Sequence, residues 1–137
     1  MEASVGAGVG KVVEFTGSSR FGSEPLVQIR MLGGLTISRR GESLSLPASR
    51  KVRALLAYLT LSPRAVPRSR LCELLWETPN DPRGELRWCL SKLRGILDEP
   101  GRPRIEARGD TVRLDLSDCF VDVLEIARAT QDGVASL

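Results

Sequence analysis

The chain has 137 residues and a net charge of +3, a length that accommodates one domain with tails. Hydrophobic residues make up 42% of it and charged residues 27%, whereas only 4% are aromatic, so a folded core must be mostly aliphatic. Histidine is absent, which excludes serine–histidine and cysteine–histidine nucleophilic pairs and histidine-ligated metal sites.

The three cysteines, Cys72, Cys89 and Cys119, are widely spaced and form no C-x-x-C pair. Cys72 and Cys89 lie beside leucines in helical patterns, so we interpret them as small buried thiols in a reducing compartment. No run of about 18 apolar residues is present, and the N-terminus lacks the pattern of a signal peptide. We therefore expect a cytoplasmic protein that binds no metal and no other cofactor.

Positive charge is concentrated in the middle of the chain. Residues 30–108 hold 16 Lys and Arg against 8 Asp and Glu, whereas the remainder holds 4 against 9. A basic middle with acidic flanks suits a protein that binds a polyanion. An anionic membrane surface would require exposed bulky apolar residues on a basic amphipathic helix, and only Trp88 hints at that.

The N-terminal part predicts a tail and then a small sheet. Residues 1–25 are rich in Gly, Ser, Ala and Val without a sustained period, so we expect a disordered tail. Residues 27–46 alternate between apolar and polar side chains in three short runs, which Gly33-Gly34 and the stretch 39–42 separate. This pattern predicts a three-stranded meander with one apolar face that needs a cover.

Two helical patterns can supply that cover. The first, over residues 49–61, has a basic first turn that opposes the helix dipole, so Arg50, Lys51 and Arg53 should either bind phosphate or pair with acids. The second spans about residues 67–76, with Arg68 and Arg70 facing outward.

The third helical pattern, over residues 81–98, has the clearest division into two faces. Leu86, Leu90, Leu93 and Leu97 form one apolar stripe at a period near 3.6. Asp81 can cap the first turn and Pro82 suits the first helical position. The other surface is basic and carries an indole, in the residues Arg83, Arg87, Trp88, Ser91, Lys92 and Arg94. Taken alone, this surface could also be the solvated side of an ordinary core helix.

Two glycines interrupt the third helix, and each costs about 1 kcal/mol relative to alanine. Gly84 either permits close approach of the backbone to DNA or has no role, and the sequence assigns no role to Gly95.

A hairpin and a further helix complete the pattern. Residues 104–115 alternate on either side of Arg108-Gly109-Asp110, which predicts a β-hairpin with Arg108 at its tip unless that arginine pairs with Asp110. Arg104 and Arg113 would lie on the strands below this tip. A helical pattern returns over residues 118–129. A small sheet, three helices and a basic hairpin form an α+β arrangement in the order of a winged helix-turn-helix, whose third helix can enter a major groove.

Four stretches of sequence carry a resemblance to a known family. They are Ile29–Leu35, Arg50–Leu59, Val66–Arg83 without its loop 77–80, and above all Leu86–Arg94. From about Val27 to Ala129 the chain resembles the N-terminal part of bacterial transcriptional activators with an OmpR-like winged-helix DNA-binding domain, of the antibiotic-regulatory-protein type.

The resemblance implies an organisation and a function. Residues 26–117 would be the OmpR-like domain, and residues 118–137 the start of a truncated helical activator domain or a C-terminal extension. Helix 81–98 would read DNA, hairpin 104–115 would be the wing, and loop 77–82 would be able to touch RNA polymerase. The family tends to bind direct repeats, so we expect a monomer in solution and a tandem pair on double-stranded DNA.

We therefore predict a DNA-binding regulator of transcription, most simply an activator, rather than an enzyme. The spaced carboxylates Glu73, Glu77, Asp81 and Glu85 are better explained by helix starts and local ion pairs than by catalysis. The alternative function is a winged-helix module that recruits a protein such as RNA polymerase, and its sign would be paired arginines around an apolar patch at Trp88. The predicted DNA contacts are Arg87, Trp88, Ser91, Lys92, Arg94, Arg68, Arg70, Arg83, Arg50, Lys51, Arg53 and Arg108.

Overall fold

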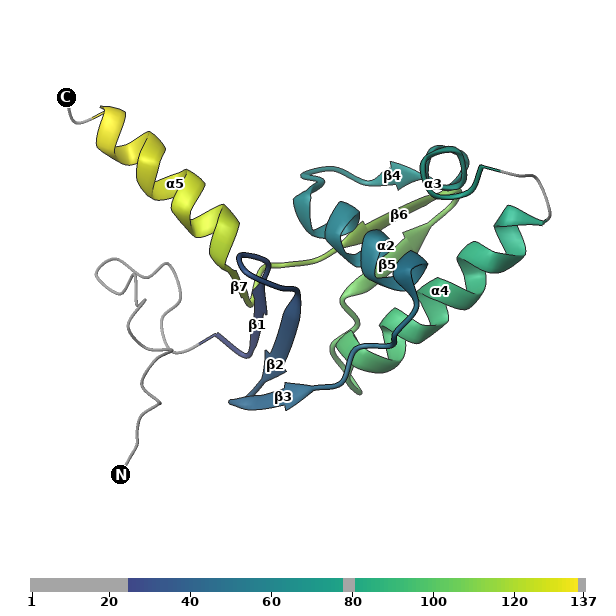
Figure 1. Cartoon of the computed structure of the whole chain (residues 1–137), viewed down its shortest axis with the longest axis horizontal. Helices are drawn as coiled ribbons and strands as arrows, with labels where there is room; N and C mark the ends of the chain where they lie inside the picture. Colours follow the sequence, from purple (N-terminus) through teal and green to yellow (C-terminus); the bar gives the residue numbers. More distant parts are fainter. Residues whose placement is uncertain (1–24, 78–80, 136–137) are drawn as a thin grey trace.

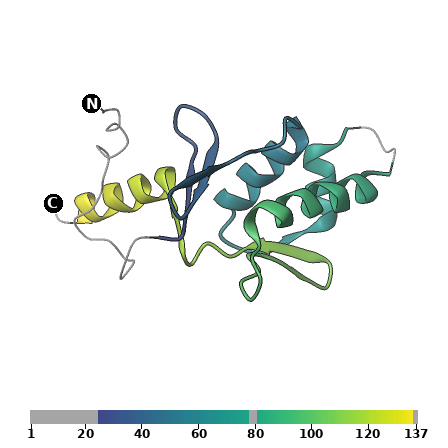
Figure 2. The same cartoon turned by 90° about the horizontal axis from the view of Figure 1, so that it is seen from below.

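The computed structural model describes residues 25–77 and 81–135. Figures 1 and 2 show a group of packed helices with an N-terminal sheet on one side and a second sheet along another, and with the C-terminal helix projecting away from them. The elements are, in chain order, β1 (Val27–Arg30), β2 (Thr36–Arg39), β3 (Glu42–Leu44), α2 (Arg50–Leu61), β4 (Val66–Pro67), α3 (Arg68–Leu75), α4 (Pro82–Leu97), β5 (Ile105–Arg108), β6 (Thr111–Leu114), β7 (Cys119–Val121) and α5 (Asp122–Ala135). The tail predicted for residues 1–25 lies almost wholly outside the described residues.

The N-terminal sheet has four strands in the order β3-β2-β1-β7, not the predicted three. The antiparallel meander β1–β2–β3 is confirmed, with Ile29 opposite Ile37 and Ile37 opposite Leu44. The additional strand β7 lies parallel to β1, and Val121 is opposite Ile29. The prediction that residues 118–121 begin a helix is therefore wrong, because a three-residue strand is too short to show its own period beside the helix that follows.

The second sheet contains the predicted hairpin. Strands β5 and β6 pair antiparallel, and Gly109 turns the chain between them with a φ of +62°, a conformation that glycine adopts without strain. The sequence predicts Val66 and Pro67 at the opening of the second helix, but in the structure they form β4 and pair with Val112 and Thr111 of β6. The wing is thus held directly to the chain that enters α3.

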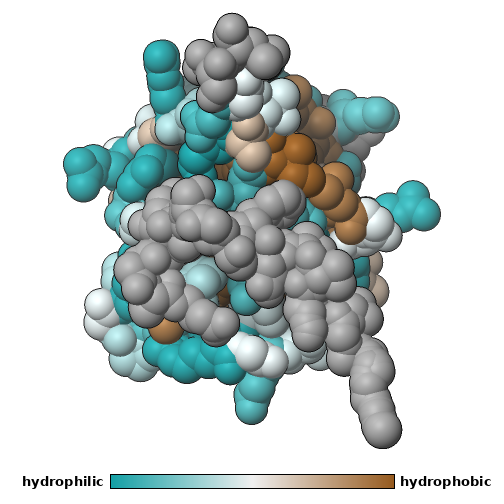
Figure 3. All heavy atoms as spheres, turned by 90° about the vertical axis from the view of Figure 1, so that its left-hand side faces the viewer, coloured by the Kyte–Doolittle hydropathy of each residue, from teal (hydrophilic) through white to brown (hydrophobic). Residues whose placement is uncertain are grey.

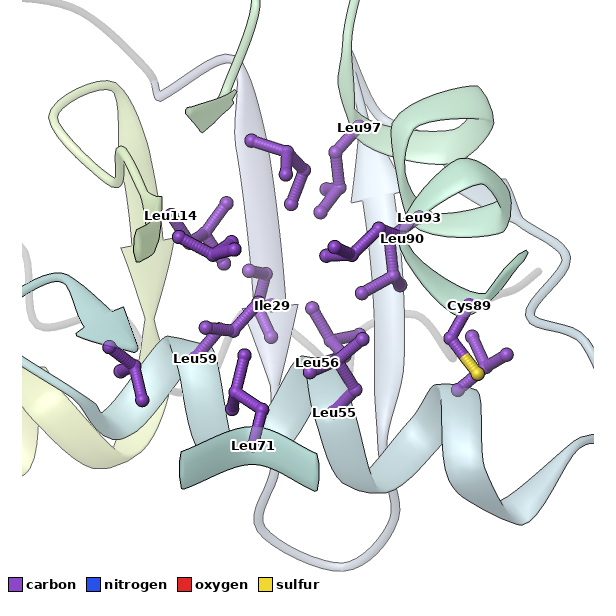
Figure 4. Close-up of a cluster of buried hydrophobic side chains, with 14 of the residues drawn as sticks. Ile29, Leu55, Leu56, Leu59, Leu71, Cys89, Leu90, Leu93, Leu97 and Leu114 are labelled. Carbon is purple, nitrogen blue, oxygen red and sulfur yellow. The ribbon is translucent and has the colours of Figure 1, made fainter. Parts of the chain in front are cut away.

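The core lies between the sheets and the three helices, and Figure 4 shows the side chains that meet there. The predicted leucine stripe of α4 is confirmed, since all four of its leucines are at most 1% exposed. In α3 the buried residues are Leu71 and Cys72, whereas Leu74 is 44% exposed. The buried stripe of α4 leaves the opposite, basic side of that helix facing solvent.

The first turn of α4 is closed by the predicted cap. The carboxylate of Asp81 accepts a hydrogen bond of 3.1 Å from the N–H of Gly84, and Pro82 begins the helix. Asp81 has a φ of +57°, which aspartate tolerates better than most residues. A Cβ on Gly84 would lie 2.2 Å from a carboxylate oxygen of Asp81, so the role of Gly84 is to leave room for this cap.

The two glycines of α4 should therefore respond differently to alanine. Gly95 has no heavy atom within 4 Å of an added Cβ, so Gly95→Ala should raise the free energy of unfolding by about 0.5–1 kcal/mol through helix propensity. Gly84→Ala should lose this gain, because it displaces a cap that is itself worth about 0.5–2 kcal/mol. Urea unfolding of the two variants beside the parent measures the difference. Equal stabilisation by both changes would contradict the role given to Gly84.

Helix α5 packs against β1 and β7 and is joined to them by its first residue. The carboxylate of Asp122 is buried and accepts hydrogen bonds from the N–H groups of Met31 and Leu32, at 2.9 and 3.2 Å. Figure 3, which views the molecule from the side on which α5 projects, shows a hydrophobic patch on that face. Ile126 of α5 and Leu32 are both exposed hydrophobic residues. In the described part of the chain, none of the helices combines the length and hydrophobicity of a membrane span.

Candidate nucleic-acid interface

The outer face of α4 presents the residues that are predicted to read DNA. Arg87, Ser91 and Lys92 are exposed, Arg94 is partly buried, and Trp88 is 52% exposed. The Lys92 ammonium lies 5.1 Å from the centre of the Trp88 ring, a cation–π distance that aligns the two side chains along the helix. Since the leucines of the opposite stripe are buried, α4 cannot rotate to hide this face.

The N-terminal end of α4 is braced by α2 and α3. The indole N–H of Trp76, at the end of α3, donates a hydrogen bond of 2.6 Å to the carboxylate of Glu85 in the first turn of α4. The Lys51 ammonium of α2 donates to the carbonyl of Leu75 and lies 5.7 Å from the centre of the Trp76 ring. These contacts join the ends of three helices around the loop between α3 and α4.

The basic first turn of α2 is engaged in a way that the sequence does not predict. Lys51 binds the carbonyl of Leu75, and Arg53 donates a hydrogen bond of 2.8 Å to the carbonyl of Pro47. Main-chain carbonyls are thus partners of two of these cations, rather than the acids considered from the sequence. Arg50 is exposed, and no acid pairs with it among the described residues.

The wing tip lies against the start of α3 and α4. The main-chain N–H of Arg68 donates a hydrogen bond of 2.8 Å to the carbonyl of Asp110. The carboxylate of Asp110 lies 3.3 Å from the guanidinium of Arg83, not in an ion pair with Arg108. Both partners of that pair are more than half exposed, so it contributes little stability, but it leaves the Arg108 side chain available at the tip.

The N-terminus of α3 carries two arginines and no side-chain cap. Pro67 occupies the capping position and its side chain accepts no hydrogen bond, and no acid lies in the first turn. Arg70 lies 3.9 Å from the carboxylate of Glu73, one of the acids for which the sequence indicates a local ion pair. The N–H of Arg68 already donates to the carbonyl of Asp110, but the positive end of the helix still favours an anion, and the two arginines add charge of the same sign.

Several cations of this surface have no carboxylate partner. In residues 25–77 and 81–135, no ion pair involves the side chains of Arg50, Arg68, Arg87, Lys92, Arg94 and Arg108. All but Arg50 belong to α3, α4 or the wing tip, which lie beside one another in Figures 1 and 2. Most of the predicted groups thus come from neighbouring elements, whereas Lys51 and Arg53 make contacts within the protein.

The base of the wing holds a charged cluster that the sequence does not predict. Arg104 is expected on a strand below the wing tip, but it is fully buried and its guanidinium binds Asp118 and Glu99. Arg102 also pairs with Asp118, and with Asp115. Dense alternation of arginines and acids over residues 98–118 is a signal of this cluster, but it does not say which of the arginines is buried.

The cluster lowers the pKa of its carboxylates. The hydrogen bond from Arg104 holds the pKa of Asp118 well below its usual value, against the opposing effect of burial. Hydrogen bonds from Arg40 and Arg104 likewise lower the pKa of Glu99. For Asp115, burial alone would raise the pKa, but hydrogen bonding by Ser117 and the charge of Arg102 bring it below the usual value.

These pKa shifts predict a loss of stability in acid. A carboxylate whose pKa is lower in the folded state stabilises the fold above its unfolded pKa, about 4 for Asp, and loses this contribution as the pH falls through the folded value. The urea concentration at the midpoint of unfolding should therefore decrease as the pH is lowered below about 4. Asp118→Asn should have a lower free energy of unfolding than the parent at pH 7. The difference between the two proteins should become smaller at pH 2–3. The control is Glu73→Gln, whose side chain is 71% exposed. A constant difference between parent and Asp118→Asn across this pH range would contradict the assignment.

The described residues contain no group of three His, Cys, Asp or Glu that could hold a metal ion. All three cysteines are buried, which confirms the predicted burial of Cys72 and Cys89. Burial raises the pKa of Cys119 to about 12 and also raises the pKa of Cys89, so neither thiol is activated as a nucleophile.

The structure is similar to known regulator structures. One is EmbR of Mycobacterium tuberculosis, in complex with a low affinity phosphopeptide, with 28% sequence identity and a TM-score of 0.59 over 70% of this chain and 27% of that one. Another is the response regulator DrrB, a Thermotoga maritima OmpR/PhoB homolog, with 29% identity and a TM-score of 0.50 over 59% of this chain and 38% of that one. The chain thus matches less than half the length of either neighbour.

No family model matches the sequence, and no curated protein matches it. The support for its classification is therefore structural: the helix order, the wing and the two neighbours agree. The described part of the chain forms an OmpR-like winged-helix domain of the kind found in these regulators.

Proposed function

We propose that the protein binds double-stranded DNA in a sequence-specific manner and regulates transcription, with α4 in the major groove. The observation that carries the proposal is the outer face of α4, where Arg87 and Lys92 are exposed without a carboxylate partner in the described residues, while the opposite face is buried. A major groove admits one α-helix, and Arg or Lys suits the O6 and N7 acceptors of guanine. Trp88 offers an apolar surface for a thymine methyl group.

The surrounding cations would position the domain on the phosphate backbone. Arg68 and Arg70 stand at the N-terminus of α3, which has no side-chain cap and belongs to the helix that normally crosses the backbone in this class of motif. Arg83 is the second residue of α4 and Arg50 is the first residue of α2, and both are candidates for phosphate contacts. Arg108 at the wing tip would enter the adjacent minor groove, where a narrow A·T-rich segment has an enhanced negative potential. Lys51 and Arg53 hold main-chain carbonyls, so we assign them to bracing the helices.

A protein-recruiting winged helix is the second candidate, and a specific feature would favour it. That feature is an apolar patch around Trp88 with neighbouring arginines paired to acids. Trp88 is exposed, but its neighbours on the helix are Arg87, Ser91 and Lys92, and no ion pair of the described residues involves them. The polar, unpaired surroundings of the indole support DNA over an apolar protein partner.

Activation of transcription and assembly on DNA belong to the same proposal. Two copies would bind a direct repeat as a tandem pair, with half-sites about 10–10.5 bp apart so that both face one side of the duplex. Contact with RNA polymerase would use the loop 77–82, of which residues 78–80 lie outside the described part of the chain. Sedimentation of the free protein as a monomer, with two copies on a tandem site, is the expected result.

A binding selection on random duplex DNA tests the central claim. The chain should enrich a defined sequence, and the enriched duplex should bind several orders of magnitude more tightly than random DNA at the same salt concentration. Enrichment of no sequence, with equal affinity for all duplexes, would overturn sequence-specific recognition. Binding to a protein partner in the absence of DNA binding would favour the second candidate.

The salt dependence of binding should identify the residues that bind phosphate. Removal of one side chain that binds a phosphate should reduce the slope of log affinity against log salt by about 1. Arg68→Ala should produce this change on both the selected and the random duplex, because a phosphate contact carries no sequence information. Arg128→Ala is the matched control, since this arginine pairs with Glu125 on α5. An unchanged slope for Arg68→Ala would remove Arg68 from the interface.

A further inference from the structure

The cluster at the base of the wing is organised around one guanidinium. Arg104 is 0% exposed, and its Nη2 and Nε donate to the two oxygens of Asp118 at 2.7 and 3.1 Å. Its Nη1 donates to the carbonyl of Leu97 at 2.6 Å and to the carboxylate of Glu99 at 2.9 Å. Every nitrogen of this guanidinium therefore has a partner, as a buried charge requires.

The partners of Arg104 belong to different segments of the chain. Leu97 is the last residue of α4, Glu99 lies in the turn that follows, and Asp118 precedes β7. Arg104 itself directly precedes β5, the first strand of the wing. One side chain thus connects the C-terminal end of the proposed recognition helix, the base of the wing and the chain that returns to the N-terminal sheet.

The main chain of the same residue is held as well. The N–H groups of Arg104 and Ile105 donate to the carboxylate of Asp98 at 2.8 and 3.0 Å, and the N–H of Asp115 donates to the carbonyl of Arg104 at 2.8 Å. Asp98 follows α4, whereas Asp115 follows the second strand of the wing. The base of β5 is therefore tied directly to the residue after α4, and the end of β6 is tied to Arg104 and through it to α4.

Displacement of the wing would be costly for a specific reason. A tilt of β5 and β6 relative to α4 would draw the Arg104 guanidinium away from the Leu97 carbonyl or from Asp118. A buried charge without its partner is strongly unfavourable, and a lysine ammonium cannot reproduce the two parallel hydrogen bonds of the guanidinium.

Arg102 lies in the same cluster but does not reach α4. Its guanidinium donates to Asp115, Ser117, Asp118 and the carbonyl of Pro103, all of which lie outside that helix. Arg102 therefore shares the charge of Arg104 and one of its carboxylate partners, without the connection to the end of α4.

We infer that Arg104 is a positioning residue for DNA recognition, which holds the wing in one orientation relative to α4 so that both can engage the same duplex. It contacts no DNA itself, because it is buried. The inference rests on the proposed function for its consequence, but the orientation that Arg104 maintains is a property of the free protein.

The first test uses the free protein and two substitutions, Arg104→Met and Arg104→Lys, with Arg102→Met as the matched control. In the parent, residual dipolar couplings of amides in α4 and in β5–β6 should fit one alignment tensor. Arg104→Met should require separate tensors, and amide exchange at residues 104, 105 and 115 should accelerate at least tenfold while exchange in α2 is unchanged. Arg104→Lys should show the same change, and it serves as the test protein if the methionine variant does not fold.

Arg102→Met should keep the single tensor, because Arg102 does not hold α4. A single tensor in the folded Arg104 variants would overturn the inference, and so would acceleration of exchange that is uniform over the whole chain. This readout needs no DNA, so it stands even if the proposed function fails.

The second test measures coupling between Arg104 and the wing tip on the selected duplex. Arg108→Ala should weaken binding severalfold in the parent, but by less than twofold in Arg104→Lys, because a wing that is no longer oriented binds the duplex only weakly. Equal effects of Arg108→Ala in both backgrounds would show that Arg104 does not position the wing. Failure of every protein to bind any duplex would instead refute the proposed function, and the couplings measured without DNA would then decide the inference.

Discussion

Arg87→Ala should weaken binding to the selected DNA sequence roughly tenfold to a hundredfold, while affinity for random duplex changes little. Arg87 stands on the exposed face of α4, one helical turn from Ser91, and no acid of the described residues pairs with it. A bidentate contact from arginine to guanine discriminates by about 1–3 kcal/mol against the wrong base, which corresponds to this range of affinity. Titrations of both duplexes at one salt concentration measure the two losses side by side.

The ratio of the two losses decides what Arg87 does. A similar decrease on both duplexes would make it a phosphate contact, since such contacts carry no sequence information. Arg128→Ala on α5 serves as the control for removal of an arginine outside the interface. A binding selection repeated with Arg87→Ala should show a weaker base preference at one position of the site. That position would identify the base near Arg87 and so locate α4 in the groove.

Leu93→Ala should remove about 2–5 kcal/mol from the free energy of unfolding, through reduced burial and the cavity left behind. Leu93 is fully buried in the cluster where α4 meets the other core elements (Figure 4). The free energy of unfolding of a natural domain is roughly 5–15 kcal/mol, so this variant should be close to unfolding at physiological temperature. Urea unfolding at 25 °C measures the change.

Ser91→Ala is the matched control on the opposite face of the same helix. Ser91 is exposed, so its replacement should change stability by no more than about 0.5 kcal/mol while affecting DNA binding if the proposed interface is correct. Leu93→Ala should reduce affinity for every duplex in proportion to the unfolded fraction. Comparable destabilisation by the two substitutions would contradict the division of α4 into a core face and a binding face.

The local features of the fold could be predicted from the sequence because their signals repeat within a few residues. The leucine stripe determined which face of α4 is buried, and Asp81 with Pro82 marked where the helix begins. Ser49 marks the start of α2 in the same way, where its hydroxyl accepts a hydrogen bond from the N–H of Val52. Burial of one face of each helix then forces its charged residues to the other, so the exposed basic surface of α4 followed from periodicity alone.

What only the tertiary structure decided depends on partners far apart in the chain. β7 is three residues long and exists because it pairs with β1, and no local pattern distinguishes it from the start of α5. Lys51 is engaged by the end of α3, and Arg104 is buried because Asp118 lies against it. In the sequence these cations are indistinguishable from those of the proposed DNA-binding face, because a charge reveals nothing of its burial. Burial and pairing are set when distant segments pack, and that packing separates the arginine that supports the wing from those free to meet a phosphate.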